Sequence, residues 1–110
     1  MTMNEYQVSA KKFINNDLDR LDWEHHALHG IVGEIGELHS IYQKIYQGHE
    51  FDKAHIKKEL GDIMWFLAEY VTAMGWDLDD IARTNIKKLS ARYPDGFTEE
   101  RSLHRKDGDL

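Results

Sequence analysis

Two pairs of acidic residues are the feature of this sequence whose residue types and spacing best fit a catalytic or metal-binding role. The pairs are Glu34 with Glu37 and Glu59 with Asp62, and three positions separate the members of each pair. On an α-helix this spacing places both side chains on one face, about 5–6 Å apart at their Cβ atoms. Two such helices packed antiparallel would bring four carboxylates together. Because like charges repel, such a group needs a cation, and the hard ions Mg²⁺ and Mn²⁺ prefer oxygen ligands.

The apolar residues around these pairs distinguish them from ordinary surface charges. Charged residues make up 31% of the chain, so one acidic pair on a solvated helix face would carry little information. Here both pairs are interleaved with apolar positions: Ile31, Val32, Ile35, Leu38 and Ile41 around the first, and Ile56, Leu60, Ile63, Met64 and Leu67 around the second. Carboxylates beside core positions tend to be partly buried, and an unpaired buried charge is costly. The pattern therefore favours a partner or a metal ion.

Helices must position these carboxylates, because apolar residues recur every three to four positions and no segment alternates as a strand would. We expect four helices, over about residues 4–16, 22–47, 53–74 and 77–93. Asp22, Asp52 and Asp77 are suitable N-caps for the last three, and Gly48 and Gly75 can close two of them in the left-handed conformation. Short turns between the helices favour antiparallel neighbours. The expected fold class is all-α.

Length and composition narrow the class of protein further. With 110 residues and 41% hydrophobic content, we expect one domain over residues 1–97 and a charged tail over 98–110 that is either disordered or packed on a neighbouring subunit. There is no cysteine, and no apolar run approaches the length of a membrane span. We expect a cytoplasmic protein without a membrane partner.

The net charge of −6 argues against binding nucleic acid through a broad basic face. It does not argue against a small phosphate-bearing substrate, because bound divalent cations would neutralise the carboxylates and supply positive potential.

Four glycines lie inside the expected helices that carry the carboxylates. They are Gly30, Gly33 and Gly36 in the first of these helices and Gly61 in the second. Each costs about 1 kcal/mol relative to alanine in a helix interior. Two explanations stay open: close approach of another backbone or a ligand, and tight packing between helices.

Three stretches in this order and spacing resemble the MazG-type nucleoside triphosphate pyrophosphohydrolases. They are GEIGEL at 33–38, KELGDIMW at 58–65 and NIKKLSARYPDGF at 85–97, and the resemblance covers about residues 24–97. It implies an all-α helix hairpin or four-helix bundle that cuts a nucleoside or deoxynucleoside triphosphate into monophosphate and pyrophosphate.

The resemblance also assigns roles to residues. Carried over by position, Glu34, Glu37, Glu59 and Asp62 are the metal ligands and catalytic carboxylates, with Mg²⁺ as cofactor and Mn²⁺ as a possible substitute. We expect direct attack of water on phosphorus, without a covalent enzyme intermediate. Several members have a further glutamate where this chain has Gly33, which leaves the general base unassigned.

Other residues are candidates for binding the nucleotide. Asn85, Lys88 and Arg92 share one face of the last helix by steps of three and four, which suits phosphates or sugar, although a solvated face would look the same. Trp23 and Phe66 could stack on the base, and they could equally be core residues.

The resemblance, together with the small number of helices available to cover two long apolar faces, implies a homodimer or homotetramer. Two other functions stay open. One is a non-catalytic or regulatory helical module that binds a metal ion, and the other is an enzyme of the phosphoribosyl-ATP pyrophosphohydrolase type. A zinc pair at His25 and His29 is disfavoured, since no third ligand lies nearby in the sequence.

Overall fold

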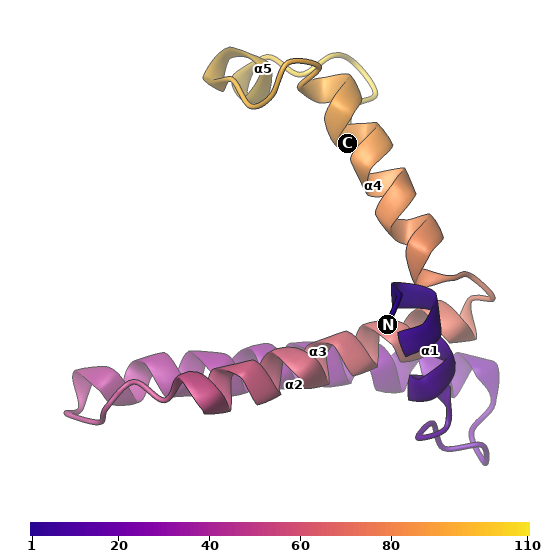
Figure 1. Cartoon of the computed structure of the whole chain (residues 1–110), viewed down its shortest axis with the longest axis vertical. Helices are drawn as coiled ribbons and strands as arrows, with labels where there is room; N and C mark the ends of the chain where they lie inside the picture. The colour runs from indigo at the N-terminus through magenta and orange to yellow at the C-terminus, as the bar shows by residue number, and fades with distance from the viewer.

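The computed structural model describes all 110 residues and contains only helices (Figure 1). The helices are α1 (Met3–Lys11), α2 (Arg20–Tyr46), α3 (Lys53–Ala73), α4 (Leu78–Arg92) and α5 (Glu99–Leu103). The predicted all-α class is confirmed. None of the five helices combines the length and the apolar character that crossing a membrane requires.

Aspartates cap the three long helices, as the sequence predicted for two of them. Asp52 and Asp77 are the N-caps of α3 and α4, and each accepts a hydrogen bond from the main-chain N–H three residues later. The expected cap of α2, Asp22, was wrong. Asp19 takes that place, and its carboxylate accepts from the N–H of Asp22 at 2.9 Å, so that the helix begins at Arg20.

The ends of the helices follow local backbone chemistry. Gly48 and Gly75 have φ angles of 92° and 74°, which confirms both as left-handed residues after helix ends. The first helix stops at Lys11, five residues before the expected end. Beyond it, the Asn15 side chain accepts from the N–H of Asp17 at 3.0 Å, a local bond that competes with helical hydrogen bonding.

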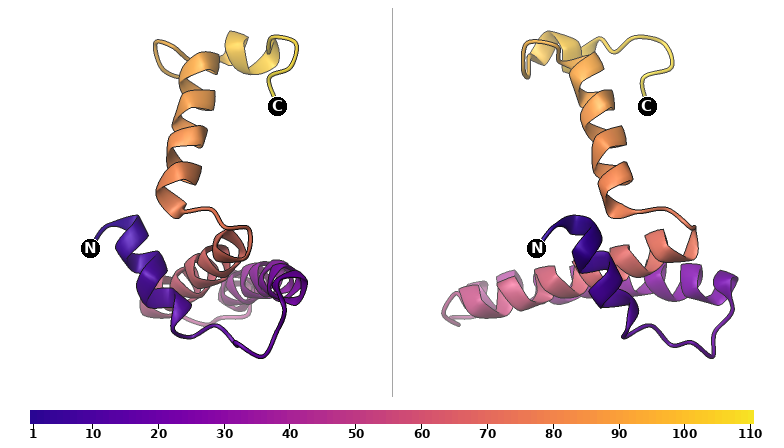
Figure 2. Two further views of the ribbon diagram at one scale, coloured as in Figure 1. Left: turned by 90° about the vertical axis from the view of Figure 1, so that its right-hand side faces the viewer. Right: turned by 45° about the vertical axis from the view of Figure 1, so that its right-hand side comes forward.

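Helices α2 and α3 form a long antiparallel hairpin, and α1 crosses α3 near the end where α4 begins (Figures 1 and 2). The small core lies at this crossing. It consists of Ala10, Ala68, Val71 and Leu78, with Tyr6, Trp65 and Ile81 packed against it. Burial there fixes α1 and the start of α4 on the hairpin.

One side chain, Gln7 of α1, holds three segments together. Its Oε1 accepts from the main-chain N–H of Leu78 at 2.8 Å, and its Nε2 donates to Thr72 Oγ1 at 3.2 Å and to the Trp76 carbonyl at 3.0 Å. These bonds join α1, the end of α3 and the start of α4. From this point α4 runs away from the hairpin, carrying α5 and the tail at its far end (Figure 1).

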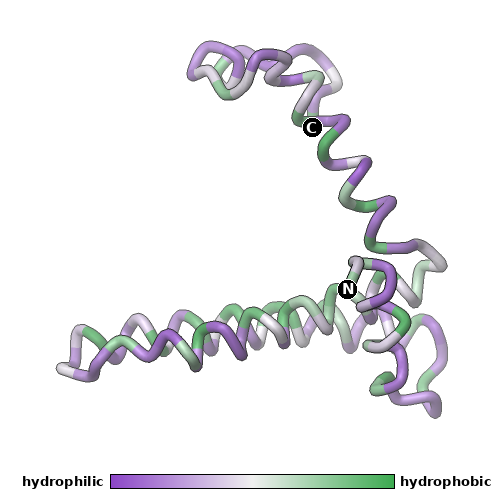
Figure 3. Tube along the Cα trace, viewed as in Figure 1, coloured by the Kyte–Doolittle hydropathy of each residue, from purple (hydrophilic) through white to green (hydrophobic).

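A single chain leaves much of the hairpin's apolar surface uncovered. Only 9 of the 110 residues are buried, and the radius of gyration is 17.4 Å, whereas a compact domain of this length has about 13 Å. Apolar segments follow α2 and α3 along the hairpin in Figure 3. The exposed side chains include Leu28, Val32, Ile35, Leu60, Met64 and Leu67. The hairpin therefore presents an apolar face that the rest of the chain does not cover.

A contact between a histidine and a buried glutamate links the two helices of the hairpin near the core. The Glu69 side chain is only 1% exposed, and its Oε1 lies 2.6 Å from His26 Nδ1. The imidazole also packs edge-on against Trp65 and Phe66. Because an unpaired carboxylate at this depth is costly, the contact helps fix the register of α2 on α3.

The four helical glycines differ in what surrounds them. A Cβ at Gly30 would lie 2.3 Å from atoms of the Phe66 ring, whereas at Gly33, Gly36 and Gly61 no other atom of the chain lies within 4 Å. Close packing within the chain thus explains Gly30 alone, and its neighbour is a side chain rather than a backbone.

We expect Gly30→Ala to lower the free energy of unfolding by about 1–3 kcal/mol, although alanine favours a helix, because the methyl group overlaps the Phe66 ring. The ring cannot easily move, since it packs against Trp65 and His26. Urea denaturation of the single variant and of Gly30→Ala combined with Phe66→Leu measures this. The second change should recover part of the loss, and an equal or higher stability for Gly30→Ala alone would contradict the argument.

Candidate metal centre

Three carboxylates from the two hairpin helices meet at one point. Glu34 of α2 and Glu59 and Asp62 of α3 each direct an oxygen into this group, and the three oxygens lie within 4.8 Å of one another. No other group of three acidic, histidine or cysteine side chains in the chain is arranged in this way. The antiparallel packing therefore brings together three of the four carboxylates that the sequence singled out.

The local sequence explains why these side chains face each other. Glu59 and Asp62 are three residues apart on α3, so they project from the same side of that helix. Glu34 lies across from them on α2. Glu34 and Glu59 are partly buried and Asp62 is exposed, so the group opens to solvent at one side. Partly buried apolar residues flank it along both helices: Ile31, Leu38, Ile56 and Ile63.

Glu37, the fourth predicted ligand, lies outside this group. Its side chain is exposed, and it is not one of the three whose oxygens converge. A step of three residues leaves a side chain about 60° short of a full turn, which places Glu37 on the solvent side of Glu34. Its charge still contributes to raising the pKa of Glu34. Its role as a ligand stays a prediction.

The three carboxylates offer more hydrogen-bond acceptors than the donors around them can satisfy. Glu59 Oε1 lies 3.1 Å from His55 Nε2, but its Oε2 is buried without any hydrogen-bond partner. A hydrogen bond with Glu59 raises the pKa of Glu34 to about 7, and burial and the charges of Glu59, Asp62 and Glu37 add to this effect. A proton on Glu34 can thus satisfy an oxygen that otherwise has no donor.

A divalent cation would satisfy the same oxygens. Three carboxylates close together, one with an orphaned buried oxygen, match the donor set that hard cations such as Mg²⁺ and Mn²⁺ prefer. The residues present therefore fit a metal ion of this kind, and ion and proton would compete for one place.

We expect this competition to appear in the pH dependence of stability. Because the folded-state pKa of Glu34 is raised to about 7, the folded protein binds more protons than the unfolded chain between about pH 4.5 and 7. Without metal, the free energy of unfolding should therefore fall as the pH rises through this window. We expect a loss of about 1–2 kcal/mol, less than the full shift would give, because the partly exposed carboxyl is screened by solvent.

Denaturation of the metal-free protein and of Glu34→Gln at pH 5 and pH 8 measures this contribution. The variant should lose less stability than the parent over the same interval, and added Mg²⁺ should stabilise the parent more at pH 8 than at pH 5. An identical pH dependence in both proteins would show that protonation of Glu34 does not contribute to the free energy of unfolding.

Two neighbours of the group were not identified from the sequence. His55 stands four residues before Glu59, a helical spacing that could have revealed it. Tyr6 of α1 has a pKa raised by burial and then by the charge of Asp62, so α1 also approaches this region. No local pattern in the sequence indicates that Tyr6 of α1 lies near Asp62.

The two aromatic candidates for base binding make contacts of their own. Trp23 is partly buried, and its Nε1 donates to the Asn15 carbonyl at 2.8 Å. Phe66, also partly buried, lies against Gly30 and packs edge-on with His26. These contacts give both residues a structural role, and stacking on a base stays a prediction for them.

The predicted phosphate-binding residues of α4 lie away from the carboxylates of their own chain, because α4 leaves the hairpin (Figure 1). Asn85 and Lys88 are exposed. Arg92 instead forms a two-point ion pair with Asp109 of the tail, at 2.7 and 2.8 Å. One chain alone does not unite the two halves of the predicted site.

Comparison with known proteins agrees with this geometry. The family model of the MazG nucleotide pyrophosphohydrolase domain matches residues 24–97, which include the whole carboxylate group and α4. The Gene 37 protein of Mycobacterium phage L5 is 26% identical over 108 residues, covering 90% of this chain and 95% of that protein. No solved structure matches the chain. With most of its length matched, and the three carboxylates in place on α2 and α3, this chain belongs to the MazG nucleotide pyrophosphohydrolase family.

Proposed function

We propose that the protein hydrolyses nucleoside or deoxynucleoside triphosphates to a monophosphate and pyrophosphate, with Mg²⁺ as cofactor and Mn²⁺ as a substitute. The observation that carries this proposal is the meeting of Glu34, Glu59 and Asp62 around a buried oxygen that has no partner. Membership of a nucleotide pyrophosphohydrolase family supports it.

In this proposal the three carboxylates hold the ion, and Glu37 joins them from the open side. When bound, divalent ions neutralise charge on the triphosphate and make water more acidic. Water attacks phosphorus, the anhydride bond between the α and β phosphates breaks, and pyrophosphate leaves. A carboxylate oxygen of the group that is not coordinated to the ion takes up the proton of the attacking water.

The substrate's phosphates or sugar would bind Asn85, Lys88 and Arg92, and its base would stack on Trp23 or Phe66. Since α4 points away from its own hairpin, we propose that a second copy of the chain brings these parts together in a homodimer or homotetramer. The uncovered apolar face of the hairpin and the large radius of gyration support this. Nucleotide pool cleansing or control in the cytoplasm is the proposed role.

A product assay tests the proposal. Purified protein is incubated with Mg²⁺ and either phosphoribosyl-ATP or one of a panel of ribo- and deoxyribonucleoside triphosphates, and pyrophosphate is resolved from orthophosphate. Monophosphate plus pyrophosphate is the expected result. Diphosphate plus orthophosphate would reject the cleavage position. Turnover of phosphoribosyl-ATP alone would reassign the substrate, and no turnover of any of these compounds would favour a non-catalytic metal-binding module.

A further inference from the structure

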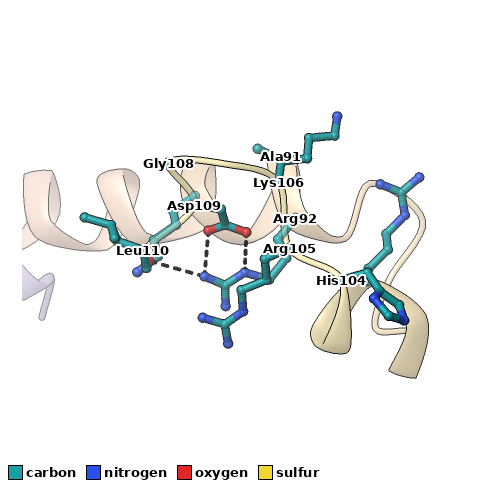
Figure 4. A pocket seen from close by; sticks show the side chains of 10 residues that line it. Ala91, Arg92, His104, Arg105, Lys106, Gly108, Asp109 and Leu110 are labelled. Carbon is teal, nitrogen blue, oxygen red and sulfur yellow. Dashed lines mark hydrogen bonds and ion pairs between the residues drawn. The ribbon is translucent and has the colours of Figure 1, made fainter.

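The far end of α4 and the tail form a pocket unlike the rest of this acidic protein (Figure 4). Its volume is about 410 Å³, which lies within the usual range for small-molecule sites. Six of its lining side chains are basic: Lys88, Arg92, Arg101, His104, Arg105 and Lys106. The only carboxylate among the lining side chains is that of Asp109. The pocket therefore concentrates positive charge in a chain whose net charge is −6.

Asp109 occupies the one partly buried cation of this pocket, the guanidinium of Arg92. Arg92 donates from Nε to Asp109 Oδ2 at 2.8 Å and from Nη2 to Oδ1 at 2.7 Å. Nη2 also donates to the Leu110 carbonyl at 3.2 Å. The Arg92 side chain is only 9% exposed and that of Asp109 17%. A guanidinium that donates hydrogen bonds to both oxygens of a carboxylate in this way can bind two oxygens of a phosphate equally well.

A turn in the tail brings the Asp109 carboxylate to Arg92. Gly108 has a φ of 85°, a left-handed conformation that side chains other than glycine rarely adopt, and the next N–H, that of Asp109, donates to the Lys106 carbonyl at 3.1 Å. The turn sends Asp109 back onto Arg92 (Figure 4). The hydrogen bond from Arg92 lowers the pKa of Asp109, and the charges of Arg92, Arg105 and Lys88 lower it further, so the carboxylate is ionised at neutral pH.

The remaining cations of the pocket have no such partner. Lys88, Arg101, Arg105 and Lys106 line the cavity and form no ion pair. Among the lining side chains, one carboxylate thus faces five permanently positive groups. A ligand with several negative charges would complement the pocket far better than Asp109 does.

We propose that residues 98–110 and the end of α4 form a binding pocket for a polyphosphate group, which Asp109 closes by occupying Arg92 in the ligand's place. Ligand and tail compete, so the tail acts as an internal inhibitor of its own pocket. The proposal rests on the proposed function in one respect, because Lys88 and Arg92 are assigned there to the substrate. Most of the pocket, however, belongs to the tail beyond the residues that the family model matches.

Calorimetric titration of inorganic tripolyphosphate into the full-length protein tests this without any need for turnover. The buffer contains neither divalent ions nor chelator, so the acidic group on the hairpin repels the probe and no other polyanion competes. We expect Asp109→Asn to bind about tenfold more tightly than the parent protein, since an uncharged amide of the same shape competes much less well for Arg92. Circular dichroism verifies that each variant is folded.

Asp107→Asn is the matched control, because it removes the same charge from the same tail at an exposed residue that does not line the pocket. Its affinity should stay within about twofold of the parent, while Arg105→Gln should weaken binding. Equal affinities for the two aspartate variants, weaker binding by Asp109→Asn, or no binding to any protein would each overturn the proposal. Because nothing here depends on catalysis, failure of the product assay would leave this result interpretable.

Discussion

Asp62→Asn should lower kcat for the best triphosphate substrate by at least about a hundredfold, and Glu59→Gln should do the same. Both changes keep the shape of the side chain but remove a charge from the group in which three carboxylate oxygens lie within 4.8 Å of one another. Replacing the partners of metal ligands already costs about 10- to 100-fold, so loss of a ligand should cost more. Steady-state kinetics at saturating Mg²⁺ measures the effect.

Glu50→Gln is the matched control for this experiment. Glu50 is an exposed carboxylate in the loop between α2 and α3, away from the three converging oxygens, so its loss should leave kcat unchanged within about twofold. Mg²⁺ should also raise the melting temperature of the parent protein and of this control but not that of Asp62→Asn. Glu37→Gln decides the role of the fourth predicted ligand. Full activity of folded Asp62→Asn would refute the metal site.

A charge on the uncovered face of the hairpin should break the assembly that we propose. The Val32 side chain is 71% exposed in the single chain, beside other exposed apolar residues of α2. If a second copy covers it, Val32→Glu buries an unpaired carboxylate at a cost of several kcal/mol, about as much as the stability of many small domains. We expect a monomer in sedimentation velocity, with reduced helical content and no turnover.

Ser40→Glu places the same charge at an exposed position of α2 about 80° around the helix from Val32, outside the stripe of Leu28, Val32 and Ile35, where it should leave the assembly intact. The parent protein should sediment as a dimer or tetramer, and its melting temperature should rise with protein concentration. A parent that stays monomeric and folded at micromolar concentration would contradict the proposed oligomer, and the source of the α4 residues at the site would have to be reconsidered.

Most features that depend on residues close in sequence were predictable, the N-cap of α2 and the end of α1 excepted. The N-caps Asp52 and Asp77 and the glycines after α2 and α3 are set by three- or four-residue contacts, and the structure has them where the sequence placed them. Glu59 and Asp62 meet for the same reason. Glu34 joins them because an antiparallel hairpin is the simplest packing of two helices joined by a short loop.

Features that depend on distant residues were not predictable. His26 meets Glu69 across 43 positions. Arg92 meets Asp109 across 17, in the tail for which the sequence left open disorder or packing on a neighbouring subunit. Helical periodicity is silent about such contacts, because it describes which face of a helix is apolar and not which partner that face meets. Likewise the spacing of Glu34 and Glu37 does not reveal which of the two turns outward.

The bonds of Gln7 have a consequence for comparing this protein with its relatives. Gln7 lies outside residues 24–97, the segment by which the family is recognised, yet it fixes the joint between α3 and α4. The direction of α4, and with it the reach of every residue that α4 carries, is thus set by a part of the chain that the shared pattern does not describe. We therefore expect members with the same carboxylates to hold this arm at different angles where their N-terminal helices differ, and if the arm binds substrate as proposed, substrate choice would change with it.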